Sequence, residues 1–119
     1  MKICKITHLS SGQILAHKCK YADSILKRFK GLMFSKKFQD SDGLILRPCN
    51  SIHTFFMNFP IDAIFIGKQD DIVAVYRNVR PWRLTPVYFS AKMVLELPSG
   101  ATPDFAKKGD KLDIKCTNL

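Results

Sequence analysis

Turn-forming residues interrupt this chain so often that its apolar runs remain short. Residues 3–7 and 14–19 are β-branched and partly alternating, and Ser10-Ser11-Gly12 separates them, which predicts a β-hairpin. The connections between later runs are mostly two to six residues long, whereas a parallel crossover needs a dozen or more residues. The sequence therefore favours a largely antiparallel sheet over an alternating α/β fold.

The later strand candidates share β-branched or aromatic residues, and turn-forming residues bound them. They are residues 43–47, 51–57, 61–66, 72–79, 92–97 and 111–116. Residues 21–30 have apolar positions at helical spacing before Gly31, and residues 102–108 can form one or two helical turns before Gly109. We therefore expect one mainly β domain over residues 1–119, with an α+β tendency. It would be a small barrel or sandwich of about eight short strands with two short helices.

The composition places the chain among ordinary globular proteins, because 46% of its 119 residues are hydrophobic and 24% are charged. No window approaches the roughly 18 apolar residues of a membrane span, and no secretory signal follows Met1, so we expect a cytoplasmic protein. The net charge of +9 could attract an anionic partner. The lysines are spread along the chain, however, which disfavours nucleic acid as the main partner.

Four cysteines are present, and none of them forms a Cys-x-x-Cys pair. They are Cys4, Cys19, Cys49 and Cys116. This spacing excludes a zinc ribbon and a thioredoxin-type pair. We expect free thiols that are buried as small apolar groups, with no metal and no cofactor.

Two acidic residues stand apart from the others. Seven of the ten acids occupy turn or cap contexts, where a carboxylate bonds to nearby backbone N–H groups. Asp62 and Glu96 instead lie among apolar residues, and Glu96 is the only glutamate of the chain. A buried carboxyl group must be paired, hydrogen-bonded or protonated. These two acids are candidates for a special role, although each could also face water or anchor a turn.

Among the three histidines, His53 is the candidate functional group. His8 and His17 lie among polar residues near the first hairpin, where we expect them to be exposed. His53 lies in the apolar run 51–57 and should be at least half buried on a strand. Strand spacing places it either on the opposite face from Asp62 or roughly 13 Å away, too far for a direct dyad. Its candidate partners are Cys49, Arg83 and Glu96.

Pro81-Trp82-Arg83 is the last candidate feature. A tryptophan beside an arginine in an irregular segment can form a flat binding wall with a cationic group. Alternatively, Trp82 caps one end of a barrel and Arg83 neutralises an acid. The chain has no Gly-rich phosphate loop, no Gly-x-Ser-x-Gly and no His-Glu-x-x-His. The best-known NTPase, hydrolase and metalloprotease signatures are therefore missing.

A series of motifs lies within residues 13–115. It comprises GLMF (31–34), GLIL (43–46), CNSIHTFFM (49–57), PIDAIFI (60–66), PWR (81–83), VLELPSG (94–100) and GD (109–110). The series resembles the prokaryotic family catalogued as domain of unknown function 192, most specifically in His-Thr-x-x-Met followed by Pro-Ile-Asp. The resemblance implies a small, mostly antiparallel β fold with little helix, and it implies no known activity. The motif positions correspond here to His53, Met57, Asp62, Arg83 and Glu96.

The leading hypothesis is a non-enzymatic binding module for a small molecule or a peptide. Its predicted pocket is lined by His53, Phe55, Met57, Trp82 and Arg83, with Asp62 or Glu96 setting the charge. One alternative is a small hydrolase or transferase that uses His53 as general base. The other is a basic scaffold that binds an acidic protein or nucleic acid. The sequence assigns no catalytic residue.

Overall fold

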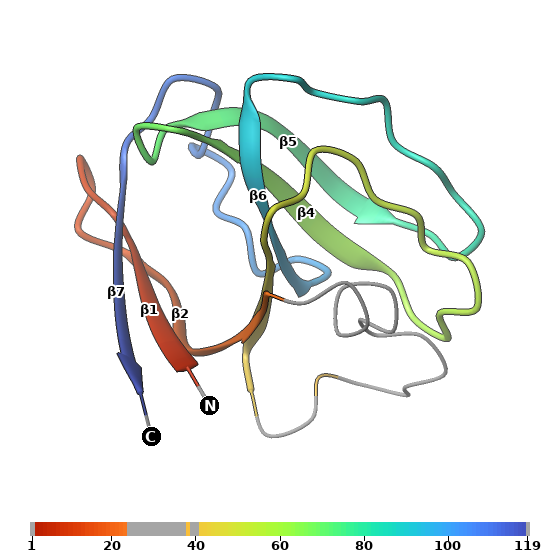
Figure 1. Ribbon diagram of the computed structural model, residues 1–119, viewed down its shortest axis with the longest axis horizontal. Helices are drawn as coiled ribbons and strands as arrows, with labels where there is room; N and C mark the ends of the chain where they lie inside the picture. The colour runs from red at the N-terminus through yellow and green to blue at the C-terminus, as the bar shows by residue number, and fades with distance from the viewer. Residues whose placement is uncertain (1, 24–37, 39–40, 119) are drawn as a thin grey trace.

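The computed structural model describes residues 2–23, 38 and 41–118, and this part of the chain is mainly β (Figure 1). Its strands are β1 (Lys2–His8), β2 (Ile14–Ala22), β3 (Gly43–Leu46), β4 (Ile61–Gly67), β5 (Ile72–Val79), β6 (Ala91–Pro98) and β7 (Leu112–Asn118). The predicted fold class and the β1–β2 hairpin are confirmed. Within the described ranges, no helix is long and apolar enough to cross a membrane.

The seven described strands form one sheet in the order β5-β4-β6-β3-β2-β1-β7. Only β2 and β3 pair in parallel, and the other neighbouring described strands are antiparallel. The two edge strands also meet, because Asp71 before β5 forms an antiparallel bridge with Lys111 before β7. The Ile72 N–H donates to the carbonyl oxygen of Asp110 at 2.8 Å. The sheet therefore curls into a barrel that closes where the β4–β5 turn lies beside β7 (Figure 1).

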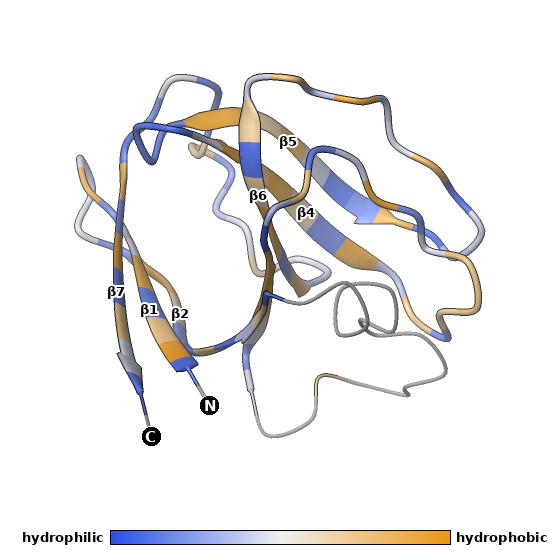
Figure 2. Ribbon diagram, in the orientation of Figure 1, coloured by the Kyte–Doolittle hydropathy of each residue, from blue (hydrophilic) through white to orange (hydrophobic). Residues whose placement is uncertain are grey.

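Both faces of β3 and β4 are buried, and the two strands are apolar along nearly their whole length, as Figure 2 shows for β4. One face contributes to a core cluster that draws on both halves of the barrel. Its largest members include Ile6, Ile45, Ile64, Ile66, Met93, Leu95 and Leu97. The other face packs against the connection between β3 and β4. This second cluster includes Leu44, Leu46, Ile52, Met57, Ile61, Phe65 and Val94.

The predicted strand 51–57 is wrong. This segment makes a single bridge, between His53 and Leu84, and Phe56 turns the backbone with a φ of 63°. Its backbone groups form hydrogen bonds with the irregular connection between β5 and β6. For example, the Thr85 N–H donates to the Ile52 carbonyl at 3.0 Å. These bonds satisfy the backbone of residues 51–57 without a regular strand ladder. The described part of the chain therefore has seven strands rather than about eight.

The predicted helix over residues 102–108 is also wrong, because two successive turns occupy this segment. The Lys107 N–H, which a helix would direct to the carbonyl of Pro103, donates instead to the Asp110 carboxylate at 3.1 Å. The Pro103 carbonyl accepts a hydrogen bond from the Arg77 guanidinium at 2.8 Å instead. In the other predicted helix, residues 21–22 belong to β2, and residues 24–30 lie outside the described residues, as does the apolar segment 31–34.

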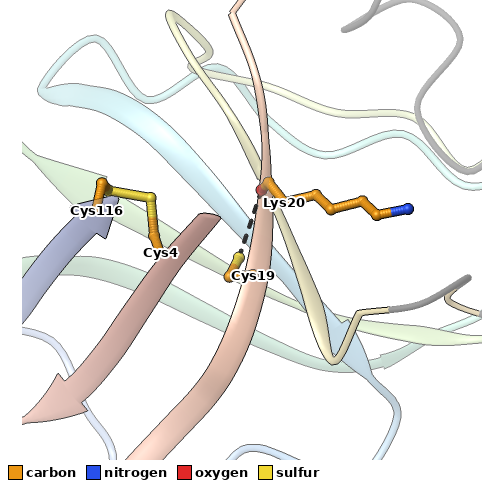
Figure 3. The surroundings of a disulfide bond; sticks show 4 residues. All are labelled: Cys4, Cys19, Lys20 and Cys116. Atoms are coloured by element: carbon orange, nitrogen blue, oxygen red, sulfur yellow. Dashed lines mark hydrogen bonds between the residues drawn. A yellow bond between two sulfur atoms is a disulfide. The ribbon is translucent and has the colours of Figure 1, made fainter. Parts of the chain in front are cut away.

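Two of the four cysteines are not free thiols, which corrects the expectation from sequence. Cys4 and Cys116 form a disulfide, because the β1–β7 register places them directly opposite each other although 112 residues separate them. Cys19 lies opposite Cys4 on the other neighbouring strand, as Figure 3 shows. Burial raises the pKa of the Cys19 thiol well above its usual value. Cys19 is therefore a poor nucleophile within the core.

We expect the disulfide to stabilise the barrel, because it fastens the last strand to β1. Replacing Cys116 with serine should lower the free energy of unfolding by about 2–4 kcal/mol. Urea unfolding of the non-reduced protein measures this loss, and Cys49→Ser is the control, because its hydroxyl can still donate to the Ser51 carbonyl. Alkylation of all four cysteines without reductant would contradict the assignment.

Candidate functional site

The seven residues predicted to line one pocket separate into two groups in the structure. His53, Phe55, Trp82 and Arg83 lie at or near the surface, on the β3–β4 and β5–β6 connections. Met57, Asp62 and Glu96 are buried. The single pocket predicted from the sequence therefore combined residues of a surface group with residues of the core.

The surface group is built from stacked rings. The His53 ring stacks on Phe55 with centroids 4.9 Å apart, and Phe55 stacks on Trp82 at 5.7 Å. The Phe56 and Trp82 rings meet edge-on with centroids 4.7 Å apart. Trp82 is 57% exposed and Phe56 is 45% exposed. We call these four residues the aromatic platform, because they present apolar rings to solvent as binding surfaces commonly do.

A buried threonine positions the platform. Thr54 lies between His53 and Phe55, and its hydroxyl donates to the Arg80 carbonyl at 2.6 Å. The same oxygen accepts the Arg83 N–H at 2.9 Å, and the Thr54 carbonyl accepts the Trp82 N–H at 3.0 Å. These bonds hold the two connections side by side and bring rings from separate parts of the chain together.

Two residues of the platform have a strained backbone. Phe56 and Trp82 have φ values of 63° and 65°, in the left-handed region that favours glycine. Each such residue costs about 1–3 kcal/mol, and such strain clusters at functional sites. On a regular strand over residues 51–57, alternation would place Phe56 on the same face as Ile52 and Thr54. Its positive φ turns it onto Trp82 instead, and for this reason sequence reasoning missed it.

His53 is a structural part of the platform. Its Nδ1 atom accepts the Phe55 N–H at 3.2 Å, and its backbone bridges Leu84. Of its candidate partners, Glu96 is buried, Arg83 is exposed, and the Cys49 thiol donates to the Ser51 carbonyl at 3.1 Å. These contacts orient the ring for stacking and give no support to a role as general base.

Asp62 anchors backbone at a bulge in the sheet. The β4–β5 register shifts beside Asp62, and Asn78 adopts a φ of 53° on the opposing strand. The fully buried carboxylate accepts the Asn78 N–H at 2.9 Å and the Thr102 N–H at 3.0 Å. Two otherwise unpaired amides are thereby satisfied, which matches the turn-anchor alternative considered for this acid.

Glu96 is a buried acid within the second core cluster. Its neighbours across the sheet, Leu44 on β3 and Ala63 on β4, both belong to that cluster. Burial raises the pKa of Glu96 to about 8, because the charged form loses its hydration in the core. Near neutral pH the protonated form therefore predominates. Within the described ranges, no group of three or more His, Cys, Asp or Glu side chains could hold a metal ion.

The fold is shared with solved structures. A protein of unknown function from Novosphingobium aromaticivorans aligns with a TM-score of 0.75 at 23% identity, covering 93% of this chain and 83% of that one. A Sinorhizobium meliloti protein aligns with a TM-score of 0.78 at 20% identity, covering 95% and 93%. The class is thus a small, curled β-sheet protein, here with an exposed aromatic surface.

Sequence comparison gives the family. Residues 6–114 match DUF192, domain of unknown function 192, described as "Uncharacterized ACR", and the chain belongs to this family. A UPF0127 protein of Thermococcus sibiricus is 35% identical over 87% of this chain and 70% of its own length. A UPF0127 protein of Thermococcus kodakarensis is 33% identical over 80% of this chain, and the match spans 62% of that relative. The resemblance stated from the motifs is confirmed.

Glu96 should make stability depend on pH. The pKa of its carboxyl is about 8 in the folded protein and near 4.5 in the unfolded chain, so the folded state binds more protons between these values. The stabilisation is fully present below about pH 4.5 and is lost as the pH rises towards 8, by up to about 1.4 kcal/mol per pH unit. Urea unfolding between pH 5 and 9 measures this slope.

The matched control is Glu96→Gln, which keeps the shape of the side chain and cannot ionise. Its unfolding free energy should vary less over the same range, and the variant should gain relative stability as the pH rises. Parallel profiles for the two proteins would show that Glu96 is ionised when folded.

Proposed function

We propose that this protein is a binding module whose aromatic platform holds a peptide segment of another protein. The observation that carries the proposal is the pair Phe56 and Trp82, two exposed rings in contact on strained backbone. Aromatic residues are enriched where proteins bind, because each supplies a large apolar area with little side-chain entropy to lose. Backbone strain at these positions supports a role for the rings outside the fold.

Exposed apolar side chains continue along the β5–β6 connection beyond the platform, and Figure 2 shows apolar positions along this segment. They are Leu84, Val87 and Phe89. Small-molecule sites are concave and enclose most of their ligand. Side chains that project this far into solvent form an open surface instead. This shape supports a polypeptide partner over a small molecule.

The charge beside the platform supports acidic groups in the partner. Arg80 and Arg83 flank Trp82 in the chain and are exposed. Their backbone groups bond to Thr54, so both arise at the border of the platform. Guanidinium groups pair with carboxylates and stack on aromatic rings. We therefore infer a peptide that combines apolar side chains with Asp or Glu.

A displayed random library of 12-residue peptides tests this proposal. Selection on the parent protein should enrich peptides that combine apolar and acidic residues. A synthetic copy of an enriched peptide should shift the fluorescence emission of Trp82, the only tryptophan of the chain. Phe56→Ala should weaken binding by about 1–3 kcal/mol, roughly 5- to 150-fold, because it removes a central ring. Titration followed by Trp82 emission measures the change.

Phe105→Ala is the matched control, because Phe105 is 47% exposed and lies before β7, away from both connections. It should bind the selected peptide as the parent does. Equal losses of peptide affinity in Phe56→Ala and Phe105→Ala would argue against a peptide site on the platform. So would a selection that enriches peptides no better on the parent protein than on a Phe56→Ala, Trp82→Ala double variant.

A further inference from the structure

A serine, a histidine and an aspartate form a hydrogen-bonded chain at the closed end of the barrel. The His8 Nδ1 atom lies 2.7 Å from the Ser11 hydroxyl oxygen, and the His8 Nε2 atom lies 2.8 Å from the Asp110 Oδ2 atom. His8 and Asp110 are 102 residues apart in the sequence. Contrary to the expectation of exposure, His8 is only 2% exposed, whereas Ser11 is exposed at the hairpin tip.

Backbone N–H groups also donate to the two ends of this hydrogen-bonded group, at Asp110 and at Ser11. The Asp110 carboxylate also accepts the Lys107 N–H at 3.1 Å, and the hydrogen bond from His8 is the main cause that lowers the Asp110 pKa. In the tautomer whose Nε2–H donates to the Asp110 carboxylate, Nδ1 can accept the Ser11 hydroxyl proton. The Gln13 N–H donates to the Ser11 oxygen at 3.1 Å and would stabilise negative charge there.

The three groups are held by the barrel itself. His8 ends β1, and its N–H donates to the Gln13 carbonyl at 2.8 Å across the hairpin. Asp110 lies at the closure of the sheet, where its carbonyl accepts the Ile72 N–H at 2.8 Å. The Phe105 and His8 rings meet edge-on with centroids 5.0 Å apart, and Phe105 helps to exclude water from the His8 ring. A rigid frame of this kind is what a preorganised site requires.

We propose that Ser11 is the nucleophile of an acyl-transfer site in which His8 is the general base and Asp110 positions His8. The Ser11 oxygen would bond to the carbonyl carbon of an ester while its proton passes to Nδ1 of His8. The bond to the alcohol oxygen then breaks, and His8 returns the proton to that alcohol. Water, activated by His8, cleaves the acyl-serine, releases the carboxylic acid and restores the Ser11 hydroxyl.

The surroundings indicate small esters with an apolar acyl group. Leu9, which adjoins His8, is 55% exposed, and Phe105, which contacts His8, is also exposed. These apolar side chains offer a surface for an acyl chain beside the serine. Ser11 itself is exposed at the hairpin tip, so a substrate can approach it from solvent. This site is built from other residues than the aromatic platform, and the inference does not depend on the peptide proposal.

A fluorophosphonate probe tests the assignment, because it bonds covalently to an activated serine oxygen and releases fluoride. Ser10 is the built-in control, since it is exposed on the same hairpin tip next to Ser11. Peptide mass spectrometry should place the adduct on Ser11. Labelling should be lost in Ser11→Ala and unchanged in Ser10→Ala.

Steady-state hydrolysis of p-nitrophenyl butyrate tests the role of Asp110. Asp110→Asn should lower kcat by about 100-fold with little change in KM, because it alters the His8 tautomer and leaves the apolar surface intact. Asp110→Glu should restore part of kcat, and thermal unfolding of both variants shows whether the fold is retained.

Absence of an adduct on Ser11 of the parent protein would overturn the proposal, as would equal labelling of Ser10 and Ser11. Hydrolysis that persists in Ser11→Ala would also overturn it, and the contacts would then only fasten the hairpin to the segment before β7. If Asp110→Asn does not fold, the comparison of Ser10→Ala with Ser11→Ala still decides the question.

Discussion

The backbone hydrogen bonds between the start of β5 and the start of β7 join the two edges of the sheet, and the rest of the structure depends on this closure. They complete the barrel around the first core cluster. In the β1–β7 pairing Leu112 lies opposite His8, and the carboxylate of nearby Asp110 lies 2.8 Å from the His8 ring. An open sheet with the same strands would leave two unpaired edges.

Two buried acids show how differently the fold satisfies carboxyl groups. The Asp62 carboxyl group is satisfied within the core because two backbone amides donate to it, one from Asn78 beside the β4–β5 bulge and one from Thr102 in the loop after β6. Glu96 lies among apolar neighbours, and burial raises its pKa to about 8. The first acid fastens a loop to the barrel, whereas the second couples the stability of the core to pH.

The two proposed sites occupy different parts of the molecule and use different chemistry. The aromatic platform lies on the β3–β4 and β5–β6 connections, where exposed rings and arginines offer an open surface. The hydrogen-bonded group of Ser11, His8 and Asp110 lies where the sheet closes, with His8 at the end of β1 and the other two residues on turns beside it. The family has no assigned activity, so each site has to be tested on its own evidence.

Much of the fold followed from local pattern. Short β-branched runs bounded by turns predicted the β1–β2 hairpin and strands β3 to β7 within a few residues, because alternation and turn chemistry act between near neighbours. The predictions failed where a distant partner replaced local structure. Hydrogen bonds of Thr54 and Thr85 take the place of strand pairing in residues 51–57. Hydrogen bonds to the Asp110 carboxylate and from Arg77 take the place of helical bonds in residues 102–108.

The candidate site was predictable only in part, for the same reason. By itself the sequence identified His53, Phe55 and Trp82 as chemically notable, and it singled out Asp62 and Glu96 as acids in apolar surroundings. The tertiary structure alone decided that the rings meet at the surface and that the acids lie in the core. It also decided that Cys4 faces Cys116 and that His8 joins Ser11 to Asp110. Those pairings depend on the register of strands far apart in the chain, and register is set by closure of the barrel and burial of its core, which no local spacing encodes.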